Sequence, residues 1–267
     1  MTEIGYFQVD GMTLREEPAR ENCFEIVYRD ADMHEYLGTE GVARRETLHR
    51  HMTNEMTSID IAAACVAEFP DAPWDLRMEL ARQCWDEARH VRALHRRLVE
   101  VGGYKGEFPI STLEWSVTCA LDTLIGRLTT QNRTLEAGAM DVVGGLARNV
   151  RASGDEDTAC LLEAILADEV QHVRFANRWI KKLVADDRRL LMKVAHAVRF
   201  LMAANAKFQI RDGGEVNAVG TVLQSPEERI PAVNVADRKL AEFSDDEIHE
   251  ILSQAGFRTL VQEPLAA

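Results

Sequence analysis

A glutamate and a histidine three residues apart occur twice in this chain, each time within a long stretch of helical periodicity. The two pairs are Glu87 with His90 and Glu169 with His172. Because residues i and i+3 lie on one face of an α-helix, each pair can bind one ion. In a chain of 267 residues with 8 histidines, roughly one such pair is expected by chance, as for any short motif. Two pairs in two similar helices constrain the fold more than any other feature.

The apolar pattern of both helices places the glutamate where a core residue is expected. The core positions step by four and three residues along each helix. In the first helix they are Leu80, Cys84, Glu87, Val91, Leu94 and Leu98, and in the second Leu162, Leu166, Glu169, Val173, Ala176, Ile180 and Leu183. An unpaired buried carboxylate is costly, so a glutamate at such a position favours a bound cation. The alternatives are a solvated helix face or a buried ion pair with Arg89 or Arg174.

Two further glutamates fall at the same depth if neighbouring helices form antiparallel pairs. The first turn, at Asp71, has Glu55 16 residues before it and Glu87 16 residues after it. The second turn, at Gly154, has Glu136 18 residues before it and the second motif glutamate 15 residues after it. A bundle site for two metals takes one glutamate from each of two helices and a Glu-x-x-His pair from each of the others. The predicted metal ligands are therefore Glu55, Glu87, His90, Glu136, Glu169 and His172.

A third Glu-x-x-His pair and a histidine near Glu55 are interpreted differently from the six predicted ligands. A third pair, Glu46 with His49, is not assigned to the site, because Glu46 lies 25 residues before Asp71. At 1.5 Å per residue this places it about 13 Å beyond the level of Glu55. His51 lies one helical turn from Glu55 and is a candidate for an additional ligand or a pocket residue. The alternative for His51 is a hydrogen-bonded histidine without a metal. No catalytic residue beyond the metal ligands is predicted.

The periodicity predicts an all-α fold built on a four-helix bundle, with an additional covering helix and with N- and C-terminal extensions. The expected bundle helices are 43–68, 74–101, 112–152 with a bend near Gly126, and 155–184, and the covering helix is 186–209. The expected domains are an N-terminal arm over 1–42 with short helices within 18–28, the di-metal helical bundle over 43–210, and a C-terminal extension over 211–267. Within the extension we expect a loop over 213–235 and a helix from Ser244 to Gly256.

The composition excludes several classes of protein. A net charge of −13 argues against nucleic-acid binding. No apolar run is long enough for a membrane span, and the first residues do not have the pattern of a signal peptide. The 5 cysteines are scattered without a Cys-x-x-Cys motif, which fits a reducing compartment. We therefore expect a cytoplasmic protein without a membrane or nucleic-acid partner.

The six predicted ligands, in this order, resemble those of the ferritin-like di-iron carboxylate superfamily. The resemblance covers roughly residues 45–210. Four segments look like a bacterial ferritin-like family of mostly unassigned function. They are Asn54-Glu55, Phe69-Pro70-Asp71-Ala72-Pro73-Trp74, Asp86-Glu87-x-Arg89-His90 and Asp168-Glu169-x-x-His172. Where that family usually continues Glu-Ala-Arg-Gly, this chain has Glu136-Ala137-Gly138-Ala139, so an arginine of the family is absent.

The resemblance implies a non-haem di-iron or iron/manganese oxygenase or oxidase. Four carboxylates balance the charge of two divalent ions, and the oxygen and nitrogen donors suit iron or manganese. The expected reaction uses O2 for hydroxylation, N-oxygenation or oxidative cleavage of a small organic substrate. An external electron donor and a homodimer are both compatible with this expectation. The alternative is a ferroxidase or peroxide-scavenging ferritin-like protein, and a helical scaffold with a structural metal is a third class.

Overall fold

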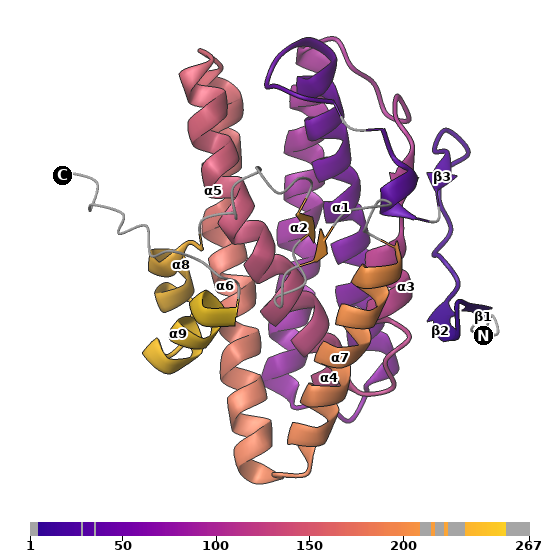
Figure 1. Cartoon of the computed structure of the whole chain (residues 1–267), viewed down its shortest axis with the longest axis vertical. Helices are drawn as coiled ribbons and strands as arrows, with labels where there is room; N and C mark the ends of the chain where they lie inside the picture. The colour runs from indigo at the N-terminus through magenta and orange to yellow at the C-terminus, as the bar shows by residue number, and fades with distance from the viewer. Residues whose placement is uncertain are drawn as a thin grey trace.

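The computed structural model describes residues 5–27, 29–34, 36–208, 215–216, 222–223 and 233–254. The chain is mostly helical, as predicted, and its long helices run side by side (Figure 1). These long helices are α1 (Gly41–Glu68), α2 (Trp74–Glu100), α5 (Ala137–Ala152), α6 (Glu156–Asp186) and α7 (Leu190–Phe208). Among the described helices, none has the length and apolar character needed to cross a membrane.

Two helical hairpins form the centre of the molecule. Helices α1 and α2 pack along their lengths, as do α5 and α6, and α2 packs against α6. The first hairpin turns where Pro70 and Pro73 end one helix and precede the next, because proline cannot continue a helix. The second turns at Gly154, whose φ of 87° favours glycine. These are the two turns from which the depth of each glutamate along its helix was counted in the sequence.

The stretch predicted as helical over 112–152 is interrupted, and the interruption lies between Thr118 and Leu124 rather than at the bend expected near Gly126. The segment divides into α3 (Leu113–Thr118), α4 (Leu124–Thr130), a π-helical segment (Gln131–Glu136) and α5. Buried Arg127 stabilises the break between α3 and α4, because its guanidinium donates hydrogen bonds to the carbonyl oxygens of Leu121 at 3.1 Å and Cys119 at 3.4 Å. The Thr123 side chain caps α4. Apolar periodicity does not reveal these contacts, since they depend on one polar side chain.

The segment before α1 contains short strands, and one of them, β3, lies where short helices were expected. Strands β1 (Tyr6–Val9) and β2 (Met12–Arg15) form an antiparallel hairpin. Strand β3 (Ile26–Val27) pairs in parallel with β4 (Ile110–Ser111), and a 3₁₀ turn follows at Asp30–Asp32. The expectation of helices within 18–28 is therefore wrong for the described residues. Pairing with a strand more than eighty residues away overrides the local pattern.

Two short helices follow the long ones and lie on the opposite side of the molecule from β1 and β2 (Figure 1). They are α8 (Val235–Leu240), which was not predicted, and α9 (Asp245–Gln254). The predicted start of α9 is confirmed, since Ser244 and Glu247 form reciprocal side-chain to backbone hydrogen bonds of 3.2 and 2.7 Å. Its predicted end at Gly256 lies outside the described residues, as does most of the predicted loop. Strands β5 (Glu215–Val216) and β6 (Val222–Leu223) pair within that loop.

Two apolar clusters enclose the middle of the hairpins. One includes Ile61, Leu76 and Leu80, and the other includes Leu48 and Leu94. Both clusters include residues of α1, α2 and α6, one toward each end of these helices. Their burial contributes the main stabilisation, at about 25 cal/mol per Å² of apolar surface. The polar residues between the two clusters therefore lie in a layer bounded by apolar packing on both sides.

Candidate metal centre

The six predicted ligands lie together in the layer between the two apolar clusters. Each side chain is buried, and the exposed fraction ranges from 0% for Glu87 to 6% for Glu55. They come from α1, α2, the end of the π-helical segment and α6. Their ligand atoms form two groups in which all atoms lie within 4.8 Å of one another. The groups are Glu55, Glu87, His90 and Glu169, and Glu87, Glu136, Glu169 and His172.

Glu87 and Glu169 belong to both groups, so these two carboxylates lie between two candidate ion positions. The Nδ1 atoms of both histidines point toward them. His90 Nδ1 is 3.0 Å from Glu87 and 3.5 Å from Glu169. His172 Nδ1 is 3.3 Å from Glu87 and 3.5 Å from Glu169. This arrangement gives each position one imidazole and one carboxylate of its own, with two shared carboxylates.

The far nitrogen of each histidine is held by an aspartate from the other motif. His90 Nε2 lies 3.1 Å from Asp168, and His172 Nε2 lies 3.4 Å from Asp86. Arg89 pairs with both aspartates, at 3.0 Å for Asp168. A carboxylate on the second nitrogen fixes the orientation of an imidazole and leaves its first nitrogen for a metal. The aspartate that precedes each motif glutamate is the sequence signal for this pairing, which the sequence analysis did not use.

Buried like charges shift the pKa values of the carboxylates. Burial and repulsion from Glu169 and Glu55 raise the pKa of Glu87 to about 8. Burial and repulsion from Glu169 also raise the pKa of Glu136 well above its usual value. Glu87 therefore binds a proton in neutral solution when no cation is present, and so does Glu136.

The pKa values of the two histidines are raised, which favours the charged form of each imidazole. Burial alone would lower the pKa of His90, but Glu55 and Glu87 raise it to about 11. The pKa of His172 is raised well above its usual value, because Glu169 and Asp86 outweigh the effect of burial. Protons on both histidines and on two glutamates carry the same total charge as two divalent cations. The cluster is thus balanced either by protons or by metal ions.

The donor set fits metal ions, because two of the buried atoms without a hydrogen-bond partner in the described residues belong to the candidate ligands. They are Glu169 Oε1 and His172 Nδ1, and both point into the cluster. Orphaned buried polar atoms are rare and call for a partner. Carboxylate oxygens and imidazole nitrogens are ligands of iron, manganese and zinc. The buried glutamate and histidine groups could therefore hold metal ions.

The π-helical segment directs three amide or carboxyl side chains at the centre. In an α-helix Gln131 and Glu136 would lie about 140° apart, whereas π-helical bonds run from i to i+5 and bring such residues to one side. Gln131 Nε2 lies 3.5 Å from Glu136 Oε1. Asn132 and Gln83 donate to the two Glu136 oxygens at 2.8 and 2.6 Å. These bonds fix the Glu136 carboxylate, and none of them follows from apolar periodicity.

A cavity of about 260 Å³ opens onto the centre from the side away from Asp86 and Asp168. Of the six ligands, only Glu55, Glu136 and Glu169 line it. Its other walls come from helices α1, α3, α5 and α7, from the π-helical segment and β4, and from Asp30. These residues are Asp30, His51, Asn54, Ser58, Ser111, Leu113, Glu114, Val117, Leu135, Ala139, Val143, Leu201 and Asn205.

Glu114 is a further titratable group on the cavity wall, and the sequence did not indicate it. Burial raises the pKa of Glu114 to about 7, although a hydrogen bond from Gln131 opposes the shift. Gln131 Nε2 donates to Glu114 Oε1 at 2.8 Å and to Ser58 Oγ at 3.2 Å. Because the same amide lies near Glu136, Gln131 links Glu114 with a ligand.

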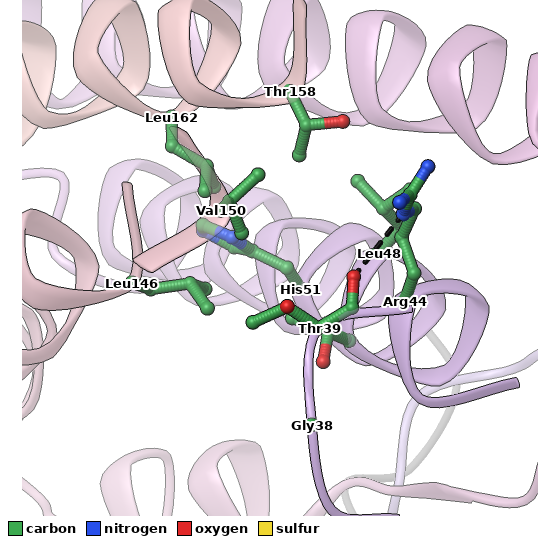
Figure 2. A pocket seen from close by; sticks show the side chains of 10 residues that line it. Gly38, Thr39, Arg44, Leu48, His51, Leu146, Val150, Thr158 and Leu162 are labelled. Atoms are coloured by element: carbon green, nitrogen blue, oxygen red, sulfur yellow. Dashed lines mark hydrogen bonds between the residues drawn. The ribbon is translucent and has the colours of Figure 1, made fainter. Parts of the chain in front are cut away.

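His51 lies between this cavity and a second, narrower pocket. His51 Nε2 is 2.7 Å from Glu55 Oε1, which is the hydrogen-bonded alternative for this residue. Burial would raise the pKa of Glu55, but hydrogen bonds from His51 and His90 hold it well below its usual value. Figure 2 shows the second pocket, where Leu146, Val150 and Leu162 surround the ring and Thr39 accepts a hydrogen bond from Arg44. His51 also lines the first cavity.

The residues set aside in the sequence have other partners. Glu46 pairs with Arg50 at 2.5 Å. His49 Nε2 accepts a hydrogen bond from the backbone N–H of Gly106, and burial lowers its pKa. Both residues lie outside the two ligand groups of the described chain.

The comparisons with known proteins give a family but no activity. A family described as protein of unknown function, DUF455, matches residues 3–249. The chain belongs to the DUF455 family. The match spans the six candidate ligands, the two aspartates and the cavity walls. No curated protein and no solved structure matches the chain.

Proposed function

We propose that this DUF455 chain is a ferritin-like oxygenase or oxidase that uses two iron ions, or one iron and one manganese, to oxidise a small organic substrate with O2. One observation carries the proposal. Two four-ligand groups share Glu87 and Glu169, and three of their carboxylates face a cavity. A structural metal site would be closed by protein ligands, whereas a catalytic site needs an open position.

The origin of the ligands supports the ferritin-like assignment. Two helices each contribute a Glu-x-x-His pair, and two other segments each contribute one glutamate, which is the pattern of carboxylate-bridged di-iron bundles. When bound, two ferrous ions would supply electrons for the reduction of O2, and the chain would supply geometry and a dry pocket.

The histidine side of the centre is closed by protein. Asp86 and Asp168 orient the two imidazoles, and Arg89 bridges the aspartates at the surface. Hydrogen bonds from His172 and Arg89 hold the pKa of Asp86 well below its usual value, so this carboxylate stays ionised. A ligand from solution would have to reach the centre from the opposite side.

The carboxylate side is open and has the character of a small-molecule pocket. Leu113, Val117 and Leu201 give it apolar walls, and Asn54 and Ser58 give it polar groups. A few polar groups on apolar walls orient a small substrate and exclude bulk water. The cavity volume of about 260 Å³ suits a compact organic molecule.

Glu114 gives this pocket a residue that can hold or release a proton near neutral pH. Its Oε1 accepts the hydrogen bond from Gln131, which leaves Oε2 as the atom that carries the proton. With a pKa of about 7, Glu114 can exchange that proton under working conditions. It is the candidate acid or base that the sequence did not indicate.

The test starts from metal-free protein loaded anaerobically with ferrous iron. We expect about two ions per chain, in line with the two ligand groups. Compact amines, alcohols and aromatic compounds would then be offered with ¹⁸O₂, and a product that contains ¹⁸O, or a desaturated or cleaved product with matching O2 uptake, would support the proposal. Rapid iron oxidation without any effect of organic compounds, with ferric iron accumulating beyond two ions, would identify a ferroxidase instead.

A further inference from the structure

The outer face of α2 carries exposed apolar and aromatic side chains. Trp74, Met78, Trp85 and Val99 are exposed by 69%, 43%, 61% and 53%. Their spacings of four, seven and fourteen residues place them on one side of the helix. Within the described residues these side chains are not covered by another element. Exposed apolar patches of this kind mark interaction sites.

The same face is basic although the protein is acidic. Four arginines of α2 are exposed: Arg82, Arg89, Arg92 and Arg96. Between Leu76 and Leu98, the acidic residues of α2 are half-buried Glu79 and buried Asp86 and Glu87. In a chain with a net charge of −13, this is a local reversal of sign. We call the surface made of these four arginines with Met78 and Trp85 the α2 face.

Part of this positive charge is not neutralised within the molecule. Arg89 is engaged by Asp86 and Asp168, and Arg82 lies 3.3 Å from Asp86. No acidic side chain among the described residues lies within ion-pair distance of Arg92 or Arg96. An uncompensated basic patch attracts an acidic partner and speeds its association.

The α2 face lies directly over the histidine side of the candidate centre. Arg89 is exposed at the surface, and its guanidinium contacts Asp168 at 3.0 Å. Asp168 in turn contacts His90 at 3.1 Å. Two hydrogen bonds therefore connect the surface with a candidate ligand, while the cavity opens on the opposite side. A partner on this face would approach the metals without entering the substrate pocket.

We propose that the α2 face docks an acidic one-electron carrier protein, which reduces the metal centre through the contacts of Arg89, Asp168 and His90. This inference rests on the proposed function. Two successive dockings supply two electrons that return two ferric ions to the ferrous state, and each carrier is oxidised by one electron. Charge selects this partner over a nucleic acid, because a long polyanion would also meet the acidic remainder of the molecule, whereas a carrier of similar size covers only the face.

The first experiment measures docking to the metal-free chain, so that it does not depend on iron or turnover. The probe is an oxidised acidic [2Fe–2S] ferredoxin, titrated at low and at high salt by calorimetry. We expect binding that weakens with salt and that falls about tenfold or more in R92E/R96E. The matched control is R148E/R199E, which makes the same charge change at exposed residues of α5 and α7 and should bind like the wild type. Circular dichroism verifies the fold of each variant.

The outcomes separate this inference from the proposed function. Equal ferredoxin binding by both double variants would overturn the docking site. If ferredoxin does not bind, the wild type is tested next with a short RNA and for self-association by sedimentation. Either interaction, if it is lost in R92E/R96E, would overturn the carrier proposal in favour of another occupant of the α2 face. In the iron-loaded chain, R92E/R96E should slow reduction by ferredoxin but leave reduction by dithionite unchanged. Failure to bind iron at all would instead reject the proposed function and leave the docking result standing.

Discussion

Replacement of Asp168 by alanine tests how the histidines are held. In the structure, the Asp168 carboxylate lies 3.1 Å from His90 Nε2 and pairs with Arg89 at 3.0 Å. Its removal takes away the contact that holds His90 Nε2 and makes the imidazole less basic. Loss of such a partner typically lowers metal affinity 10- to 100-fold, which is about 1.4 to 2.7 kcal/mol.

The effect should be confined to one of the two ion positions. His90 belongs to the group with Glu55, whereas His172 belongs to the group with Glu136. A titration of metal-free protein with Co²⁺, followed by absorbance and calorimetry, should therefore show one weakened and one unchanged binding step in D168A. D86A should weaken the other step, because Asp86 holds His172.

A matched control and a clear refutation are available. Asp157 lies on the same helix with its side chain 86% exposed, and D157A should bind both ions like the wild type. Unchanged affinity at both steps in D168A and D86A would refute the reasoning that these aspartates orient the ligands. Loss of both steps in D168A alone would show that the two positions are not independent.

Four further predictions follow from the same geometry. E87A should weaken both metal-binding steps and H172A only one, as measured by the same titration, since Glu87 belongs to both ligand groups and His172 to one. Equal loss in both variants would contradict the shared role of Glu87. Metal affinity should fall as pH falls, because Glu87, Glu136, His90 and His172 hold protons in the metal-free state. Binding of two ions at neutral pH should release about four protons, which a titration in weakly buffered solution with an indicator dye measures. If no protons are released, the proton-balanced cluster is excluded. A139F should keep both metals but lose any O2 uptake that depends on an organic substrate, because Ala139 lines the cavity; unchanged substrate-dependent uptake would place the substrate elsewhere. R127A should lower the free energy of unfolding by about 2–4 kcal/mol in denaturant titrations, because it leaves buried carbonyl groups unpaired. A change below about 0.5 kcal/mol would show that Arg127 does not stabilise the break between α3 and α4.

The depth argument from the sequence located four glutamates because each turn is marked locally. Pro70, Pro73 and Gly154 end helices through their own backbone properties, so distances along the helices can be counted from them. For Glu136 the distance counted from the turn is correct although the helix was predicted without its interruption, because regular α5 fills the interval between Glu136 and the turn. The break and the π-helical segment lie on the other side of it.

What the sequence could not predict depends on contacts between distant segments. Asp86 reaches the histidine of α6 only because two helices pack at one level, and that distance is absent from a single-helix pattern. Helix α8 has six residues and is held by a buried arginine, Arg238, which pairs with Asp141 on α5. Short elements with long-range polar anchors have little periodic signal.

The most direct test of the account is to locate bound metal in crystals of protein loaded with Mn²⁺, using anomalous diffraction at the manganese edge. The account predicts two peaks between α1, α2, the π-helical segment and α6. Both peaks should lie beside Glu87 and Glu169, one near His90 and the other near His172. No peak in this layer, or peaks that lie only at surface carboxylates, would contradict it.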